Sequence, residues 1–228
     1  MPRPSTIAID GPAAAGKSTI GGLLAQRLSY LYLDTGAMYR AVTWVTLERG
    51  VDIDDEEAVT ALARDIDITI TRPSVDDGRQ YTVLADGEDV TWQIKRPEVD
   101  RRVSPVSAYP GVRQVLTEQQ RRIGQQGCVV MIGRDIGTVV MPDADLKVYL
   151  DASPEERARR RHRELLERGD EADYEEILRA MKRRDRIDRH RAVAPLRAAD
   201  DAIKVDTDNL SIEEVLQVVE EIVQEASS

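Results

Sequence analysis

Gly11-Pro12-Ala13-Ala14-Ala15-Gly16-Lys17-Ser18 matches the eight-position phosphate-binding pattern G-x-x-x-x-G-K-[ST]. The preceding residues, Thr6 to Asp10, form an apolar run that reads as a short buried strand, and the residues from Lys17 to Leu28 have a helical pattern. Small residues let such a loop wrap around a phosphate with its amide hydrogens pointing inward. A strand that enters the loop and a helix that leaves it therefore predict a nucleotide-binding site.

The loop also supplies two groups that a bound triphosphate uses. Lys17 offers a positive charge to the terminal phosphates, and Ser18 offers a hydroxyl to Mg²⁺. The predicted ATP-binding residues are Gly11, Pro12, Ala13, Ala14, Ala15, Gly16, Lys17, Ser18 and Thr19, with Ser18 as the metal ligand. The chain has no N-K-x-D element for guanine and no internal repeat, which argues against a GTPase and a transporter ATPase respectively.

The composition indicates a globular protein. Of 228 residues, 41% are hydrophobic and 32% are charged, which suffices for one well-cored domain with a sizeable insertion. The net charge of -10 argues against a nucleic-acid polymer as partner, since such a partner requires a broad basic surface. Basic residues gather between Arg157 and Arg197, a pattern that suits a small polyanion held in a local basic cleft.

Other features of the chain bear on its surroundings. No apolar run approaches the roughly 20 residues that cross a bilayer, and we expect no signal peptide and no membrane partner. The single cysteine, Cys128, sits in an apolar run, so we expect a buried, inert thiol. These features predict a cytoplasmic protein. The acidic surface and the lack of exposed apolar stripes favour a monomer.

Alternating strand and helix patterns predict an α/β fold with a mostly parallel sheet. Besides the first strand, the expected core strands are Tyr30 to Asp34, Cys128 to Ile132, Leu146 to Leu150 and Ala202 to Val205. Four further pairs are expected to mark helix starts: Asp54 with Glu57, Ser153 with Glu156, Asp173 with Glu176, and Ser211 with Glu214.

Between residues 65 and 95 the sequence pattern changes from helical to alternating. Three short runs alternate polar and apolar residues, Asp67 to Thr71, Tyr81 to Leu84 and Glu88 to Thr91, with Asp-Gly turn signals between them. These runs predict a small antiparallel sheet inserted into the main fold.

Four segments in order resemble bacterial cytidylate kinases, and the resemblance runs from about Ile7 to the final helix. The segments are GPAAAGKST at 11–19, DTGAMYR at 34–40, GRDIGTVV at 133–140, and RDRIDR with RAVAPL at 184–196. The resemblance implies a single P-loop kinase domain, residues 1–228, with a five-stranded parallel sheet flanked by helices. It also implies an inserted β subdomain at 65–95 on the acceptor side and an Arg-rich lid at 153–170. The implied reaction transfers the terminal phosphoryl group of ATP to CMP or dCMP, with Mg²⁺.

The same resemblance nominates site residues. Those implied for acceptor binding are Thr35, Arg40, Ser104, Arg113, Arg134, Asp135, Arg184, Asp188 and Arg191. Those implied for catalysis are Lys17, Arg134, Arg184 and the lid arginines Arg157, Arg160 and Arg161. Phosphoryl transfer needs alignment and positive charge more than a general base, and the fixed forks of arginines suit phosphate groups.

Alternatives stay open at this level. Any single lid arginine could instead belong to a solvated helix face, paired with Glu164 or Glu167. Asp34 and Thr35 could simply cap the next helix. The chain could also be a P-loop kinase for another small metabolite, or a non-catalytic nucleotide sensor. The inserted sheet favours a cytidylate kinase over a kinase for another metabolite. The intact phosphate loop and the arginines argue against a non-catalytic sensor.

Overall fold

The computed structural model describes residues 3–167 and 169–227, and a five-stranded parallel sheet runs through its centre. The strand order is β2-β6-β1-β7-β8, formed by β1 (Thr6–Asp10), β2 (Leu31–Asp34), β6 (Val129–Gly133), β7 (Leu146–Asp151) and β8 (Ile203–Asp206). The first strand lies in the middle, where Asp10 pairs with Gly133 on one side and with Tyr149 on the other. The carboxyl ends of all five strands therefore meet at one edge of the sheet.

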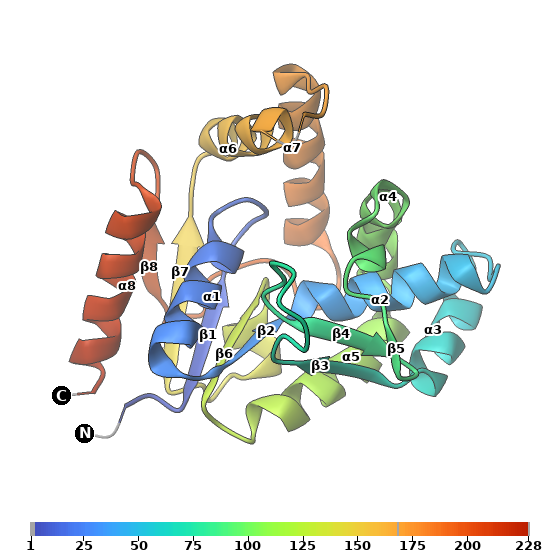
Figure 1. The fold of residues 1–228 in the computed structure, drawn as a ribbon, viewed down its shortest axis with the longest axis horizontal. Helices are drawn as coiled ribbons and strands as arrows, with labels where there is room; N and C mark the ends of the chain where they lie inside the picture. The colour runs from blue at the N-terminus through green and yellow to red at the C-terminus, as the bar shows by residue number, and fades with distance from the viewer. Residues whose placement is uncertain (1–2, 168, 228) are drawn as a thin grey trace.

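Helices pack against this sheet, and two of them lie beyond its carboxyl edge (Figure 1). Helix α1 (Lys17–Leu28) packs against β6 and against the last helix, α8 (Ile212–Glu225). Helices α6 (Pro154–Glu167) and α7 (Tyr174–His190) pack together beyond the upper end of β7 in the view of Figure 1. The remaining helical elements are α2 (Thr35–Glu48), α3 (Glu56–Asp65), η1 (Gln93–Lys95), α4 (Pro97–Val106), α5 (Pro110–Gly124) and the π-helical η2 (Ile136–Val140). The predicted α/β fold with a five-stranded parallel sheet is confirmed.

A separate antiparallel sheet is built from β3 (Ile68–Thr71), β4 (Thr82–Ala85) and β5 (Glu88–Asp89), in that order. Its strands keep one apolar face, on which Ile68, Ile70 and Val83 are buried. The predicted small antiparallel sheet is therefore present. The loop between β3 and β4 reaches back to α1, where the Arg72 guanidinium donates to the carbonyl of Ser29 (3.0 Å).

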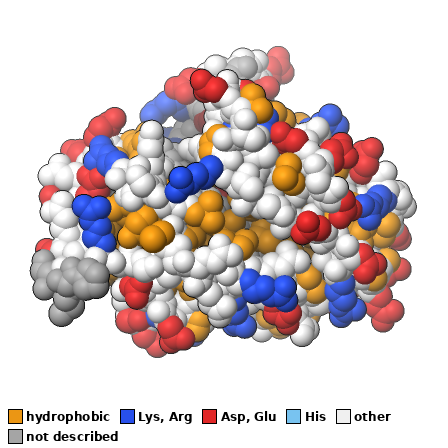
Figure 2. Space-filling model, turned by 60° about the horizontal axis from the view of Figure 1, so that its bottom comes forward, with side chains coloured by type: hydrophobic (Ala, Val, Ile, Leu, Met, Phe, Trp, Pro, Cys, Tyr) orange, Lys and Arg blue, Asp and Glu red, His pale blue; other side chains and the backbone are white. Residues whose placement is uncertain are grey.

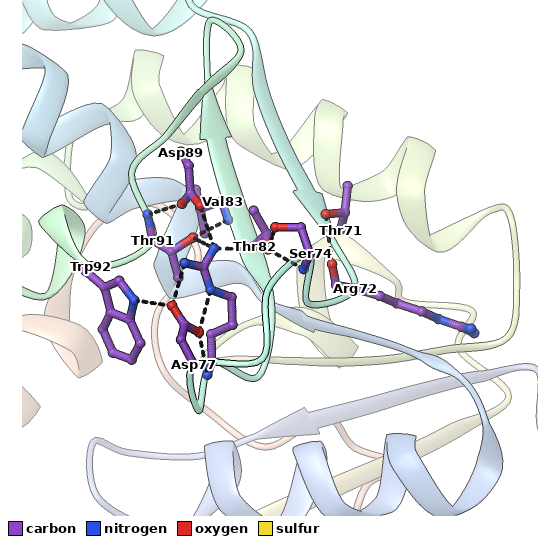
Figure 3. Close-up of polar contacts among 10 residues, drawn as sticks. Thr71, Arg72, Ser74, Asp77, Thr82, Val83, Asp89, Thr91 and Trp92 are labelled. Carbon is purple, nitrogen blue, oxygen red and sulfur yellow. Dashed lines mark hydrogen bonds and ion pairs between the residues drawn. The ribbon is translucent and has the colours of Figure 1, made fainter.

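Figure 3 shows the side chains of Asp77, Asp89 and Trp92 gathered beside this small sheet, where Arg79 pairs with both carboxylates. The Arg79 side chain is only 6% exposed and forms ion pairs with Asp77 (2.7 Å) and Asp89 (2.5 Å). The indole N–H of Trp92 donates to the same Asp77 carboxylate at 2.8 Å. One guanidinium thus joins the β3–β4 loop, β5 and the segment that enters η1.

Two sequence expectations were wrong. Cys128 is exposed rather than buried, and its φ of +49° lies in the left-handed region. The chain turns at Cys128 after Gly127, so β6 begins one residue later and the thiol faces away from the core. The helix expected to start at Asp54 is instead capped by Asp55, whose carboxylate accepts from the N–H of Ala58 (3.0 Å).

The other expected helix starts are confirmed. Ser211 and Glu214 form a complete capping box, and Asp173 and Ser153 accept from the N–H groups of Glu176 and Glu156. Among the described residues, no helix combines the length and the apolar character that crossing a membrane requires.

Candidate active site

The phosphate loop leaves the centre of the sheet at its carboxyl edge. Gly11 has φ of +149°, and a Cβ there would lie 2.0 Å from the carbonyl oxygen of Leu150. No side chain fits so close to β7. Gly16 has φ of +91° and stands at the N-cap of α1, where a left-handed backbone favours glycine. The loop is thus shaped by two glycines whose positions tolerate no larger residue without strain.

Lys17 lies inside this loop. Its ammonium donates to the carbonyl of Pro12 at 2.6 Å, and the side chain is buried. The pKa of Lys17 is lowered to about 7, mainly by burial and then by the nearby positive charge of Arg134, while Asp34 and Asp10 oppose the shift. A lysine in this state has a strong electrostatic preference for an anion. Ser18, the next residue, is exposed at the start of α1, and Thr19 is half-buried.

Opposite the phosphate loop, the end of β6 presents a second loop. Arg134 donates from Nε to Asp188 on α7 at 2.5 Å. Asp135, which is buried, accepts from Arg113 on α5 and from Arg191 just after α7 (3.2 Å). Arg191 also lies 3.9 Å from Asp188, so five predicted acceptor residues from three parts of the chain form one connected network.

Arg113 is the most enclosed member of this network, at 2% exposure. It donates to the carbonyl of Ser107 at 3.0 Å and lies over the ring of Tyr39, 5.5 Å from the ring centroid. Its Nε is buried and has no hydrogen-bond partner in the part of the chain that the structure describes. A buried donor without a partner costs free energy, and a ligand acceptor would relieve that cost.

Arg184 lies close to Arg134. The positive charge of Arg134 is the main cause that lowers the pKa of Arg184 to about 10, and burial adds to the effect. Lys17 is influenced by both arginines. Three cations from the phosphate loop, the β6 loop and α7 therefore converge, and the nearby carboxylates of Asp188 and Asp100 only partly offset their repulsion.

The remaining predicted acceptor residues line the helices beside this network. Thr35, at the start of α2, is buried and donates to the carbonyl of Ile132 at 2.9 Å. Arg40, one turn further along α2, forms an ion pair with Asp100 of α4 at 2.5 Å. Ser104 is half-buried on α4, and its carbonyl accepts from the hydroxyl of Ser107 (2.9 Å).

The three lid arginines differ from one another. Arg157 is 1% exposed and forms a two-pronged ion pair with Asp185 of α7, at 3.1 and 2.5 Å. It also donates to the carbonyls of Ala152 (3.0 Å) and of Ala13 in the phosphate loop (3.1 Å).

Arg160 donates to the carbonyl of Thr207 at 2.5 Å, and Arg161 pairs with Glu164 at 2.9 Å. Arg157 and Arg160 thus have partners within the protein, and Arg161 makes the surface pair that the sequence left open as an alternative. A contact between these three side chains and the transferred phosphoryl group stays a prediction.

The comparisons with known proteins agree with this geometry. The family model for cytidylate kinase matches residues 7–228. The chain belongs to the cytidylate kinase family. It is 56% identical over 220 residues to the cytidylate kinase of Roseiflexus castenholzii, covering 96% of this chain and 93% of the relative. The cytidylate kinase of Chloroflexus aggregans is 54% identical over 216 residues, with 95% and 92% covered. That of Bacillus velezensis is 48% identical over 227 residues and covers both chains completely.

The sequence reasoning missed two carboxylates at the candidate site of this family member. Asp185 pairs with Arg157 across 28 positions, and Asp10 lies buried at the end of β1. For Asp10, the sequence did offer one signal, because a charged residue ends the apolar run of β1. The sequence pattern does not show which distant groups contact a carboxylate, so the partners of Asp10 and of Asp185 could not be predicted.

Proposed function

We propose that this chain transfers the terminal phosphoryl group of ATP to CMP or dCMP, giving ADP and CDP or dCDP. The observation that carries the proposal is the convergence of Lys17, Arg134 and Arg184 between the phosphate loop and the network around Asp135, in a member of the cytidylate kinase family. Cations that repel one another in the free protein are stabilised when a polyphosphate lies between them.

In this mechanism the protein aligns two phosphates and neutralises developing charge. The amide groups of residues 11–19 hold the ATP phosphates, and Lys17 follows the phosphoryl group as it leaves. Arg134 and Arg184 contact the equatorial oxygens of the group in transit. No side chain is required as a general base, because the acceptor phosphate is itself the nucleophile. Catalysis then rests on in-line positioning and on excluding water.

The network around Asp135 is proposed to bind the acceptor. Cytosine offers an amine donor, a ring nitrogen acceptor and a carbonyl acceptor, and Arg113 and Asp135 carry groups complementary to that edge. The unpartnered Nε of Arg113 supports this assignment. Ser104 and Arg191 complete the proposed base pocket. Thr35, Arg40 and Asp188 are proposed to hold the phosphate and sugar.

The residues present fit Mg²⁺ as an ion that arrives with ATP. The Ser18 hydroxyl is exposed at the first turn of α1 and is one available ligand. Across the described ranges, no three His, Cys, Asp or Glu side chains gather to hold a metal by themselves. Mg²⁺ commonly takes few protein ligands and keeps phosphate oxygens and waters. When bound, it would neutralise charge on the phosphates.

The organisation and setting of the enzyme are part of the same proposal. One kinase domain spans residues 1–228, with the acceptor-side insertion at 65–95 and the lid at 153–170. We place the reaction in the cytoplasm and expect a monomer whose partners are the nucleotides ATP, CMP and dCMP. The acidic composition and the single cysteine support this placement.

An acceptor panel with Mg-ATP, scored by ADP release, tests the reaction. We expect CMP and dCMP to be good acceptors, UMP poorer, and AMP and GMP very poor. Lys17→Ala should lose most of the activity, at a cost of roughly 3–4 kcal/mol in the transition state. A different best acceptor would point to another metabolite kinase, and nucleotide binding without any turnover would point to a sensor.

A further inference from the structure

Asp10 joins the two halves of the candidate site. It is the last residue of the central strand β1 and is 4% exposed. One carboxylate oxygen accepts from the N–H of Ile136 and the other from the N–H of Gly137, each at 2.8 Å. These two N–H groups belong to the first turn of η2 and lie 126 and 127 positions away in the chain.

This contact joins the loop proposed to bind ATP to the loop proposed to bind the acceptor. On one side, the residue after Asp10 is Gly11, which begins the phosphate loop. On the other side, Ile136 follows Arg134 and Asp135, which pair with Asp188 and with Arg113 and Arg191. A single carboxylate therefore fixes the backbone of the acceptor loop relative to the backbone of the donor loop.

The surroundings leave this contact little freedom. A Cβ on Gly137 would lie 3.0 Å from the Lys147 side chain and 3.5 Å from the Asp10 carboxylate. The ammonium of Lys147 is directed elsewhere, to the carbonyl of Pro142 and to Asp201. The Asp10 carboxylate is thus held by two backbone N–H groups, and the aliphatic stem of Lys147 packs closely against Gly137, which donates one of them.

Keeping a carboxylate at this position costs stability. The pKa of Asp10 is raised to about 6, mainly by burial and in smaller part by the negative charge of Asp135. The N–H groups of Gly137 and Ile136 and the charge of Lys17 offset only part of this rise. Because this buried carboxylate bridges the two loops of the candidate site, its position points to a role in the reaction.

We propose that Asp10 is a positioning residue for phosphoryl transfer, which holds residues 134–137 at a fixed distance and orientation from the phosphate loop. The inference rests on the proposed function. Asp10 acts through the two backbones and touches neither nucleotide. Its contribution is to place the acceptor in line with the terminal phosphate of ATP, and in-line transfer tolerates small displacements poorly.

The chain offers a matched control at the other end of the same strand. Asp145 also accepts from two backbone N–H groups with its carboxylate, those of Ser5 (2.8 Å) and Thr6 (2.9 Å). Both Asp10→Asn and Asp145→Asn remove the negative charge. Asp10 uses its two carboxylate oxygens for the two N–H donors, so its amide loses one of these bonds, whereas Asp145 accepts both N–H groups on one oxygen, which its amide can keep. Only the first of these sites lies at the carboxyl edge of the sheet.

The test compares steady-state kinetics of wild type, Asp10→Asn and Asp145→Asn, with folding checked by circular dichroism and thermal unfolding. We expect Asp10→Asn to lower kcat by about 100-fold while KM for ATP and KM for CMP change little. Asp145→Asn should keep the wild-type kcat. A wild-type kcat in Asp10→Asn, or a rise in KM for ATP alone, would overturn the proposal, because Asp10 would then only shape the fold or the phosphate loop.

Gly137→Ala tests the same contact if Asp10→Asn does not fold. The added methyl group would contact the Lys147 side chain and shift the loop, while the charge of Asp10 stays the same. A drop in kcat that is smaller than the 100-fold drop expected for Asp10→Asn, with KM for ATP and KM for CMP unchanged, would support the proposal. An unchanged kcat would count against it. The wild-type rate with CMP tests the proposed function separately. If another acceptor proved best, the ratio of variant to wild type would be measured with that acceptor.

Discussion

At the scale of single residues, Lys17 has a strongly lowered pKa, and this shift leads to a prediction for ATP binding. Its pKa of about 7 means that near pH 8 most of the free protein has a neutral Lys17. The polyphosphate of ATP favours the charged form, so its arrival raises the pKa again. The bound complex should therefore hold more protons than its separated partners.

We predict that ATP binding near pH 8 takes up a fraction of a proton approaching one per site, and that this uptake declines as pH falls below about 7. Titration calorimetry in two buffers of different ionisation enthalpy measures the uptake. Lys17→Met retains the apolar stem and should lose the uptake, which corrects for protons taken up by other groups. Equal heats in both buffers for wild type would mean that Lys17 is already charged in the free protein.

At the scale of elements, the small sheet depends on its central arginine. Removing the Arg79 guanidinium would leave the carboxylates of Asp77 and Asp89 without their shared cation and Trp92 without a fixed partner (Figure 3). The sheet is short, so side-chain ties of this kind contribute much of its order.

We predict that Arg79→Met reduces amide hydrogen-exchange protection across β4 and β5 while α1 keeps its protection. Exchange followed by mass spectrometry on peptides covering residues 82–89 measures this. Arg49→Met is the matched control, because Arg49 pairs with Asp86 of the same subdomain but both side chains are about half exposed. An exposed pair contributes little. Equal loss of protection in both variants would argue against a special role for Arg79.

The elements also show how far the sequence could predict the structure. The strands β1, β6 and β7 were predictable because buried parallel strands read as apolar runs, and the phosphate loop was predictable because its spacing is fixed by chemistry. Cys128 was misjudged because an apolar run does not reveal a left-handed turn at its first residue.

The long-range pairs of the site could not be predicted. The sequence nominated Arg157 as a lid arginine, with Glu164 or Glu167 as alternative partners, and did not predict its contacts with Asp185 and with the carbonyl of Ala13. Since Arg157 and Arg160 anchor the first turns of α6, any closing motion of the lid would begin beyond them. Such partners depend on how α6 and α7 pack, which the local pattern does not contain.

At the scale of the whole molecule, charge is divided between surface and site. The chain carries a net charge of -10, and on the face shown in Figure 2 acidic and basic side chains lie interspersed with hydrophobic ones. The cations that the candidate site gathers are instead drawn inward to the carboxyl edge of the sheet. A small anion with several phosphates therefore meets a local attraction that the surface as a whole does not offer.

This division predicts how ligands stabilise the protein. A nucleotide that binds only the folded state at about 100 times its Kd adds about 2.7 kcal/mol, which raises Tm by roughly 5–10 °C for a chain of this size. We expect CMP and a non-hydrolysable ATP analogue each to give such a shift, and AMP at the concentration used for CMP to give much less. Arg113→Met should lose most of the CMP shift and keep that of the ATP analogue, since we propose that Arg113, which pairs with Asp135, belongs to the base pocket of the acceptor. Thermal unfolding monitored by circular dichroism at several protein concentrations measures these shifts, and a monomer gives midpoints that do not change with concentration. If Arg113→Met weakened both shifts equally, the assignment of the base pocket would be wrong, although the phosphate loop could still bind ATP.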